Sequence, residues 1–382
     1  MPPAVRSPRS STRSRWTRWL KAVGLSLALG AVHPQVAHAA SYNPELTWRT
    51  LTTEHFRIHF HGGEEQLAEE TAQLAEEIWA EMTAEVGWSP KLKTEMVLVD
   101  NTDSANGYAM TLPQNTIVIF VTAPYEDSTL SHYEDWTDAI LTHEYTHILH
   151  IDNTEGMITG LRSVFGRIVT VNRLSPGWVT EGYATFQETV HTPWGRGRSS
   201  IADMIKRMTV VEAEFPPLGN LDGFQVAPPS GNLRYLFGQD FMQWVAEHHG
   251  QQSWTDFIHH YGGGIPYLLP GKKTFGEPIR KLYKQWRSDT IERYDAQIDA
   301  IAAQGVTEYR ILNDPDDQCA APTFSPSGAR LVWSCSDLFT GSKIELADGN
   351  GENIVNKLDQ RYATDFAWTP EGDAFAFSAC FG

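Results

Sequence analysis

The sequence predicts an α+β domain followed by the beginning of an all-β segment. Short runs with the apolar and polar alternation of strands come first, up to residue 121. Apolar residues at the three-to-four spacing of helices then prevail as far as residue 303. Beyond that point a strand–turn–strand pattern occurs twice.

Residues 1–39 have the three parts of a secretory signal peptide. Residues 1–21 carry six Arg or Lys and no acid, residues 22–32 are apolar, and Ala37-His38-Ala39 is a small-x-small cleavage site. The apolar run is too short to span a membrane, and no later run is long enough. We therefore expect an exported protein, periplasmic or extracellular, without a membrane span.

Removal of this segment takes away six positive charges and changes the formal net charge from −17 to −23. So acidic a balance argues against binding to nucleic acid. The length that remains is too great for one small domain, and it suggests two. We place their boundary between residues 305 and 306.

The first domain begins with strands and one long helix. Strands are expected at residues 55–60, 95–99 and 116–121, and a helix at residues 64–86. The first strand carries His55, His59 and His61, which could suggest a metal cluster. A solvated strand face is the favoured interpretation of these histidines.

Helices follow in the second half of this domain. They are expected at residues 131–152, from residue 178 onward, and at residues 201–214, 235–249, 253–261 and 279–303. The first of them contains no Pro or Gly, and Asp127, Ser128 or Ser131 could cap its start.

Residues 143–147 read His-Glu-Tyr-Thr-His. On a helix, His143 and His147 share one face about 6 Å apart along the axis, so both imidazoles can bind one metal ion. Glu144 points differently and can hold the attacking water and take its proton. The pattern predicts a catalytic zinc site, and the alternative is a core helix with two buried histidines.

A catalytic zinc ion needs three protein ligands and one open position. His150 shares the helix face of His143 but lies roughly 10 Å along the axis, so a structural or supporting role is favoured for it. Glu181 begins the helix after Pro176-Gly177, among apolar residues that would pack this helix on the first. We predict Glu181 as the third ligand, and the alternative is an ordinary carboxylate at a helix start.

Residues 178–184, Trp-Val-Thr-Glu-Gly-Tyr-Ala, resemble the Trp-x-x-Glu-Gly-x-Ala motif of gluzincin peptidases of the aminopeptidase N type. In that family the glutamate, here Glu181, is the third zinc ligand. Residues 235–238 resemble the family's Tyr-x-x-Gly, whose tyrosine, here Tyr235, stabilises the oxyanion. A core tyrosine is the alternative for Tyr235. The resemblance implies a zincin-like fold with one zinc ion, in which a small sheet lies over a helical half with the cleft between them.

The chain departs from this family in two ways. The interval between His147 and Glu181 is longer than the family usually has, which suggests an insertion at residues 153–176. The Gly-Ala-Met-Glu-Asn motif that holds a free amine is also missing. Its absence favours endopeptidase over aminopeptidase activity.

The candidate substrate-binding residues precede the zinc helix. We expect residues 116–121 to form an edge strand that pairs with the substrate backbone, and a buried strand is the alternative. The candidates are Asn106, Gly107, Ile117, Val118 and Ile119.

The tail contains a repeat, because residues 324–334 recur as residues 368–378 with a period of 44. Each copy reads strand, Pro-x-Gly turn, strand, and a period of roughly 40–45 residues is typical of a propeller blade. The repeat resembles the TolB-like propeller motif, and a propeller offers a surface for a protein partner. A propeller needs several blades to close. We therefore interpret residues 306–382 as one blade and part of a second, in a fragment or truncated product; the alternative is a small two-hairpin appendage.

All three cysteines lie in this tail, so none is expected to bind the metal. Cys319 and Cys335 flank the Pro-x-Gly turn symmetrically, which would place them opposite each other on neighbouring strands. Export would allow a disulfide between them. Cys380 would be left over, with its partner in missing sequence.

Together these patterns predict an exported zinc-dependent peptidase that acts on peptides or proteins, with Glu144 as its general base. The rival prediction is a catalytically inactive zincin–propeller scaffold that binds a partner. The intact set of His143, Glu144, His147, Glu181 and Tyr235 argues against the rival, because an inactive descendant has no reason to keep the base.

Overall fold

The computed structural model describes residues 46–124, 130, 133–223, 231–264, 270–313, 317–337, 341–359 and 363–379. The predicted signal peptide at residues 1–39, the candidate caps Asp127, Ser128 and Ser131, and Cys380 lie outside these ranges. Within them, no helix combines the length and the apolar character that a membrane crossing requires.

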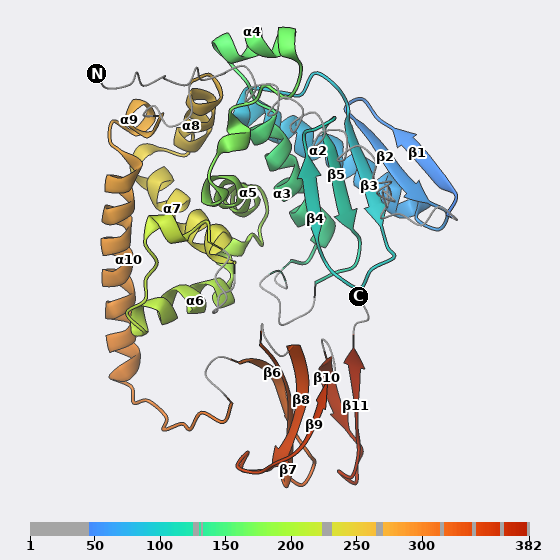
Figure 1. Cartoon of the computed structure of the whole chain (residues 1–382), viewed down its shortest axis with the longest axis vertical. Coiled ribbons are helices and arrows are strands. Elements are labelled where there is room, and N and C mark those ends of the chain that lie inside the picture. The colour runs from blue at the N-terminus through green and yellow to red at the C-terminus, as the bar shows by residue number, and fades with distance from the viewer. Residues whose placement is uncertain are drawn as a thin grey trace, which may run out of the picture. The chain divides into compact units, whose positions relative to one another are not determined.

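The first half of the predicted peptidase domain, the region before residue 306, is a five-stranded mixed sheet (Figure 1). Its strands are β1 (Trp48–Thr52), β2 (Phe56–His61), β3 (Thr94–Val99), β4 (Gly107–Met110) and β5 (Thr116–Phe120). They lie in the order β1-β2-β3-β5-β4, with β2, β3 and β5 parallel and the two outer strands antiparallel to their neighbours. The three predicted strands are therefore confirmed, and β1 and β4 are additional.

Helix α2 (Glu65–Val86) makes the crossover between the parallel strands β2 and β3. It ends at Gly87, whose φ of 67° is the left-handed conformation typical of a helix end. Helix α3 (Trp136–Ile151) packs beside it, and Figure 1 shows both against the sheet. Their apolar side chains and those of the sheet form one buried core, which includes Phe56, Ile58, Met96, Leu98, Ala75, Ile78, Leu141, Tyr145 and Ile148.

The prediction that residues 116–121 form an edge strand is wrong. β5 pairs with β3 on one side and with β4 on the other, so its backbone groups are already bonded. Ile117, Val118 and Ile119 are 0%, 0% and 1% exposed. An uninterrupted apolar run is the pattern of a strand covered on both faces. The edge strand on this side of the sheet is β4, whose side chains alternate between intermediate and exposed, and β1 is the edge strand on the other side.

Helices make up the second half of this region. They are α4 (Gly156–Phe165), α5 (Gly177–His191), α6 (Ser200–Val211), α7 (Leu233–His249), α8 (Ser253–Gly262), α9 (Pro270–Phe275) and α10 (Ile279–Ala302), with single 3-10 turns η1 (Asn172–Leu174), η2 (Arg196–Arg198) and η3 (Leu218–Asn220). The helices predicted from residues 178, 201, 235, 253 and 279 are confirmed. α4 falls within residues 153–176, the predicted insertion. A second core, rich in aromatic rings, joins these helices around Trp178, Phe237, Phe241, Trp254 and Trp286.

Helices α5 and α7 touch backbone to backbone. A Cβ atom built on Gly182 would lie 2.9 Å from Cα of Gly238, and one built on Gly238 would lie 2.8 Å from the carbonyl oxygen of Trp178. No side chain larger than hydrogen fits at this crossing. Gly182 directly follows Glu181, and Gly238 lies one helical turn after Tyr235, so the crossing fixes the separation of these two residues.

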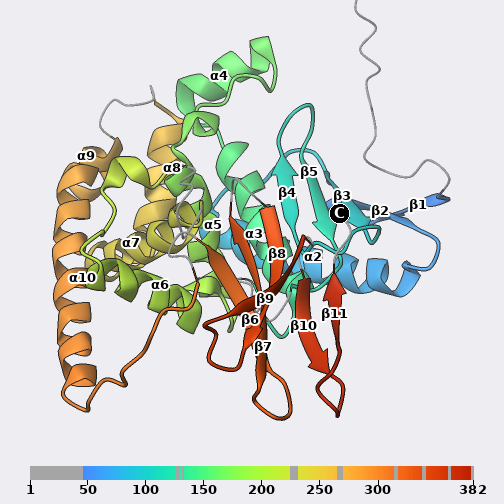
Figure 2. The ribbon, with the colours of Figure 1, turned by 60° about the horizontal axis from the view of Figure 1, so that its bottom comes forward.

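The tail forms two antiparallel sheets (Figure 2). The first contains β6 (Gln318–Phe324), β7 (Arg330–Asp337), β8 (Gly341–Asp348) and β9 (Ile354–Asp359), and the second contains β10 (Ala363–Trp368) and β11 (Phe375–Ala379). Within residues 318–379 the described strands make no closed ring, so the propeller stays a prediction. Cys319 and Cys335 lie opposite each other on β6 and β7 and form a disulfide, which the symmetric spacing anticipated.

The repeat is also visible in the backbone. Gly328 and Gly372 both have φ 71° and both close their turns by donating to the carbonyl three residues earlier. Ala321 and Asp365, also 44 residues apart, have the rare positive φ values of 53° and 54°, next to equivalent bulges in β6 and β10. Local strand geometry thus recurs with the sequence period.

Candidate metal centre and active site

Helix α3 supplies two histidines from a segment that is buried on almost every side. Its residues from Ala139 to His150 are all buried, because the helix lies between the sheet and α5. The cap is Asp135, which accepts from the backbone N–H of Asp138. The helix therefore begins at Trp136, a few residues later than predicted. His147 lies one helical turn after His143, and the centroids of their rings are 4.8 Å apart.

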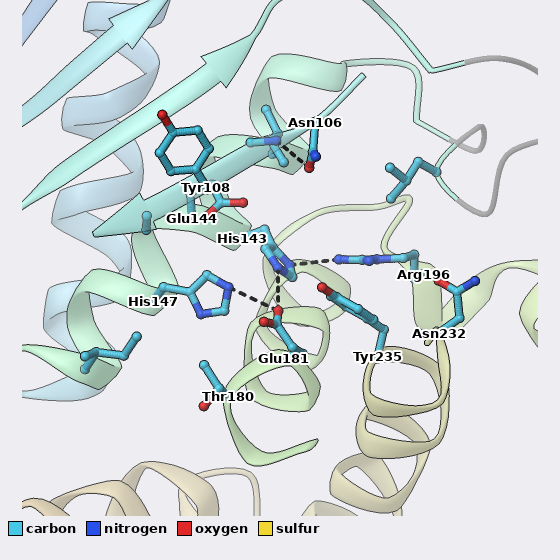
Figure 3. Close-up of a pocket in the computed structure, with 15 residues that line it drawn as sticks. Asn106, Tyr108, His143, Glu144, His147, Thr180, Glu181, Arg196, Asn232 and Tyr235 are labelled. Carbon is cyan, nitrogen blue, oxygen red and sulfur yellow. Dashed lines mark hydrogen bonds and ion pairs between the residues drawn. The ribbon is translucent and has the colours of Figure 1, made fainter. Parts of the chain in front are cut away.

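Glu181 of α5 faces both histidines across the interface between the two helices (Figure 3). Its Oε2 lies 3.5 Å from Nε2 of His143 and 3.3 Å from Nε2 of His147. Two ligand atoms at about 2.05 Å from a tetrahedral ion are separated by about 3.3 Å. The carboxylate oxygen thus lies at the spacing of a fellow zinc ligand from each of the two imidazole nitrogens.

The charges of this group fit the same interpretation. Burial works against ionisation of Glu181, but the two neighbouring histidines outweigh it and hold the pKa of this carboxyl far below its usual range. Glu181 is therefore a carboxylate, the form that binds a metal ion.

Glu188, two turns after Glu181 on α5, holds the other nitrogen of His143. Its Oε2 lies 3.0 Å from Nδ1 of His143, and Nη2 of Arg196 lies 2.8 Å from the same nitrogen. One ring nitrogen can donate to Glu188 or accept from Arg196, but not both. When Nδ1 donates to Glu188 it carries the proton, so the lone pair of the ring is on Nε2, which faces Glu181.

Arg196 joins this pair to Tyr235. Its guanidinium donates to both oxygens of Glu188 at 2.8 Å, and its Cζ lies 4.9 Å from the centre of the Tyr235 ring. Tyr133 also donates to Glu188, at 2.7 Å. Burial raises the pKa of Tyr235 to about 12, so its hydroxyl stays protonated. Figure 3 shows this hydroxyl directed toward the histidines and Glu181.

Glu144 lies on the side of α3 that faces the sheet edge. It is buried, and its Oε2 has no hydrogen-bond partner among the described residues. Burial raises the pKa of this carboxyl. β4 comes so close here that a Cβ on Gly107 would lie 3.2 Å from Cγ of Glu144 and 2.8 Å from Cγ1 of Ile140. Glycine at position 107 lets the edge strand approach Glu144.

His150 lies outside this group. Its Nε2 lies 3.2 Å from the hydroxyl of Ser175, and its ring packs edge-on against Tyr183. Burial lowers the pKa of His150 to about 3, so its ring is neutral.

A pocket opens onto the candidate metal ligands. Asn106, Gly107, Tyr108 and Ala109 line one side of it, while Thr180, Glu181, Arg196, Asn232 and Tyr235 line the other. The structure thus brings Asn106 and Gly107 to the site as predicted. Ile117, Val118 and Ile119 do not line this pocket, because they lie in the covered strand β5.

The sequence analysis missed Glu188, Arg196 and Tyr133. Glu188 could have been identified from the sequence, because it lies seven residues after Glu181 and therefore on the same face of α5. Arg196 and Tyr133 lie beyond helix ends, and only the tertiary fold brings them to Glu188.

Residues 68–215, which contain His143, Glu144, His147 and Glu181, match the model of Peptidase family M48. No curated protein matches the chain. Among solved structures, yeast LTA4 hydrolase is 11% identical with a TM-score of 0.40, over 62% of this chain and 38% of that one. Aminopeptidase A of Legionella pneumophila is 12% identical with a TM-score of 0.36, over 83% and 34%. An M1 zinc metallopeptidase of Deinococcus radiodurans is 14% identical with a TM-score of 0.31, over 63% and 51%.

The chain therefore spans between about a third and a half of the length of these structures. The match to M48 includes the grouped His143, Glu144 and His147, so residues 68–215 have the features of a domain of the zinc metallopeptidase class. The resemblance seen in the motifs is confirmed at the level of this class, and the family model that matches is that of M48.

Proposed function

We propose that this protein is an exported zinc-dependent endopeptidase that binds one zinc ion per chain through His143, His147 and Glu181. The observation that carries the proposal is the position of Glu181, whose Oε2 lies within 3.5 Å of Nε2 of both histidines. Two imidazoles and one carboxylate are a donor set of catalytic zinc sites, and here a pocket adjoins them.

Bound zinc would lower the pKa of a water molecule to about 7 and polarise the substrate carbonyl. The side chains of the protein have separate tasks. Glu144 accepts a proton from the attacking water and returns it to the leaving amine, for which its raised pKa is suited. Tyr235 donates its hydroxyl proton in a hydrogen bond to the carbonyl oxygen as negative charge develops there. Glu188 and Arg196 hold His143 in place.

The edge strand β4 is suited to hold an extended peptide. It is the last strand of the described sheet, and its residues Gly107, Tyr108 and Ala109 line the pocket. Backbone pairing with such an edge accepts most side chains. The carboxylates among the described pocket residues are Glu144 and Glu181, and both already have a task. Among these described residues no further acid is available to a free amino terminus, which supports internal cleavage.

The remaining parts of the proposal rest on the sequence. The basic and apolar stretches of residues 1–39 support export to the periplasm or beyond the cell. The repeated strand–turn–strand units support a TolB-like propeller in residues 306–382, which would offer a surface to a protein partner.

Hydrolysis of a mixed peptide library by the purified mature chain tests the activity. We expect cleavage that a chelator abolishes and zinc restores. Glu144→Gln should lose cleavage but retain zinc, whereas Glu181→Ala should lose both. Undiminished zinc in Glu181→Ala would move the third ligand elsewhere. If the chain binds zinc but cuts no peptide, the scaffold function replaces the peptidase.

Mass spectrometry of the products tests the mode of cleavage. Peptides with a blocked amino terminus should be cut internally, about as fast as free ones. Ordered release of single residues from free termini, with blocked peptides intact, would instead establish an aminopeptidase.

A further inference from the structure

A second group of metal-binding side chains lies in the sheet half of the peptidase region. His61 is the last residue of β2, Glu64 immediately precedes α2, and Asp100 immediately follows β3. One nitrogen or oxygen of each lies within 4.8 Å of those of the other two. None of the three lines the pocket at His143.

The ring of His61 is oriented as in metal-binding histidines. Its Nδ1 lies 3.1 Å from the carbonyl oxygen of Gly62, which can only accept, so Nδ1 carries a proton and Nε2 is the nitrogen that an ion would bind, in place of the proton it shares with Asp100. Nε2 faces Oδ1 of Asp100 at 2.6 Å and Oε2 of Glu64 at 3.5 Å. In metal sites the nitrogen that does not bind the ion usually donates to a carbonyl or carboxylate in this way.

Glu64 supplies an independent indication. The residue is 6% exposed, and its Oε1 has no hydrogen-bond partner among the described residues. Its other oxygen is directed at His61 and accepts from the backbone N–H of that residue at 2.9 Å. A buried carboxylate oxygen without a partner is costly, and a cation beside it would remove that cost. Asp100 has a side chain that is 45% exposed, so it can shift to admit an ion from solvent.

We propose that His61, Glu64 and Asp100 form a second divalent-cation site, suited to zinc and, more weakly, to manganese. One imidazole and two carboxylates suit first-row transition metals, whereas calcium prefers six or more oxygen ligands. The ligands come from the end of β2, the start of α2 and the end of β3. An ion there links the two strands to the helix that connects them. It therefore stabilises the sheet half and does not affect peptide hydrolysis.

Equilibrium dialysis of the mature chain against zinc chloride, with bound zinc measured by elemental analysis, tests the site. The background is the double variant His143→Ala, His147→Ala, which removes the proposed catalytic site. We expect this background to bind one zinc ion per chain. Addition of His61→Ala should abolish that binding. His59→Ala is the matched control, because His59 lies on the same strand but pairs with Glu95 at 2.9 Å, and it should retain the ion.

A second variant distinguishes loss of the metal site from a folding defect. Asp100→Asn changes an exposed side chain and should weaken zinc binding at least tenfold while the circular dichroism spectrum stays unchanged. Zinc should also raise the melting temperature of the background but not that of the His61→Ala variant.

Absence of zinc from the background, or equal zinc in the His61→Ala and His59→Ala variants, would overturn the proposal and make His61 an ordinary partner of two carboxylates. Every variant lacks the catalytic site, so the result does not depend on whether the protein is a peptidase.

Discussion

At the residue scale, Arg196 connects the proposed metal centre with the proposed oxyanion donor. It contacts the Glu188 carboxylate, the Nδ1 side of His143 and the face of the Tyr235 ring. A guanidinium keeps its charge at any physiological pH and has a rigid planar shape. One buried cation therefore sets the position of a ligand and of a catalytic hydroxyl together.

Replacement of Tyr235 by phenylalanine tests the hydroxyl alone. Tyr235→Phe should lower kcat by roughly 10²–10³, the usual effect of removing one oxyanion donor. Zinc content and thermal unfolding should not change, because the ring still packs against Arg196. Tyr261→Phe is the control, since it removes a hydroxyl outside the pocket. Equal turnover by the two variants would make Tyr235 a packing residue.

Local geometry explains which site residues could be predicted. His143, Glu144 and His147 stand on one helix, where spacing alone fixes their relative positions. Glu181 was identifiable because a recognisable motif surrounds it. Arg196 was not, because it belongs to the 3-10 turn after α5, and no periodicity links that turn to Glu188.

At the scale of elements, an ion pair inside the helical half joins α6 to α7. Lys206 is 3% exposed, and its Nζ lies 2.5 Å from Oδ1 of Asp240. The other oxygen of Asp240, Oδ2, accepts from the indole N–H of Trp286 at 2.9 Å. Burial opposes ionisation of Asp240, but the charge of Lys206 outweighs it and lowers the pKa of this carboxyl. Asp240 is therefore a carboxylate at neutral pH.

Asp240→Asn should destabilise the protein by about 3 kcal/mol at pH 7, because it leaves Lys206 buried without a counter-charge. The lowered pKa means that the contribution of Asp240 is complete above about pH 4 and is lost as the pH falls through the folded-state pKa. The difference between wild type and variant in denaturant unfolding should therefore shrink toward strong acid. Asp295→Asn, at an exposed position, is the control. A difference that does not vary with pH would contradict the assignment.

The crossing of α5 and α7 gives a second prediction at this scale. Gly182→Ala would place a methyl group 2.9 Å from the backbone of Gly238, so the helices must separate. We expect a loss of about 1–3 kcal/mol in stability. Activity should fall even far below the melting temperature, because Glu181 and Tyr235 move apart. Gly160→Ala in α4, whose new methyl meets nothing within 4 Å outside its own helix backbone and chain neighbours, should lower neither quantity.

Helices and strands could be predicted here, whereas strand order could not. The helix at α2 and the strand β5 follow from apolar spacing, which is a local property. We predicted β5 as the edge strand because β4, which lies at the edge, has only four residues and no strong apolar pattern. The pairing of β4 with β5 depends on the tertiary structure. The identity of the strand that meets the substrate therefore had to come from the structure.

At the scale of the whole molecule, the disulfide is confined to the tail, in cores separate from those of the peptidase region. Joint replacement of Cys319 and Cys335 by serine should destabilise the tail by about 3 kcal/mol, the value for a loop of this length. Hydrogen exchange should quicken in β6 to β9, while peptide hydrolysis stays unchanged. A matched loss of hydrolysis would show that the tail supports the site.

The two cores of the peptidase region meet at the proposed zinc. His143 and His147 project from α3, whose Leu141 and Ile148 belong to the core under the sheet. Glu181 projects from α5, whose Trp178 belongs to the aromatic core of the helices. An ion held by all three is a cross-link between two separately built hydrophobic units, and it binds only when both are folded. Calorimetry should show one cooperative unfolding transition with zinc and two after chelation, so that the metal makes a single folding unit out of two.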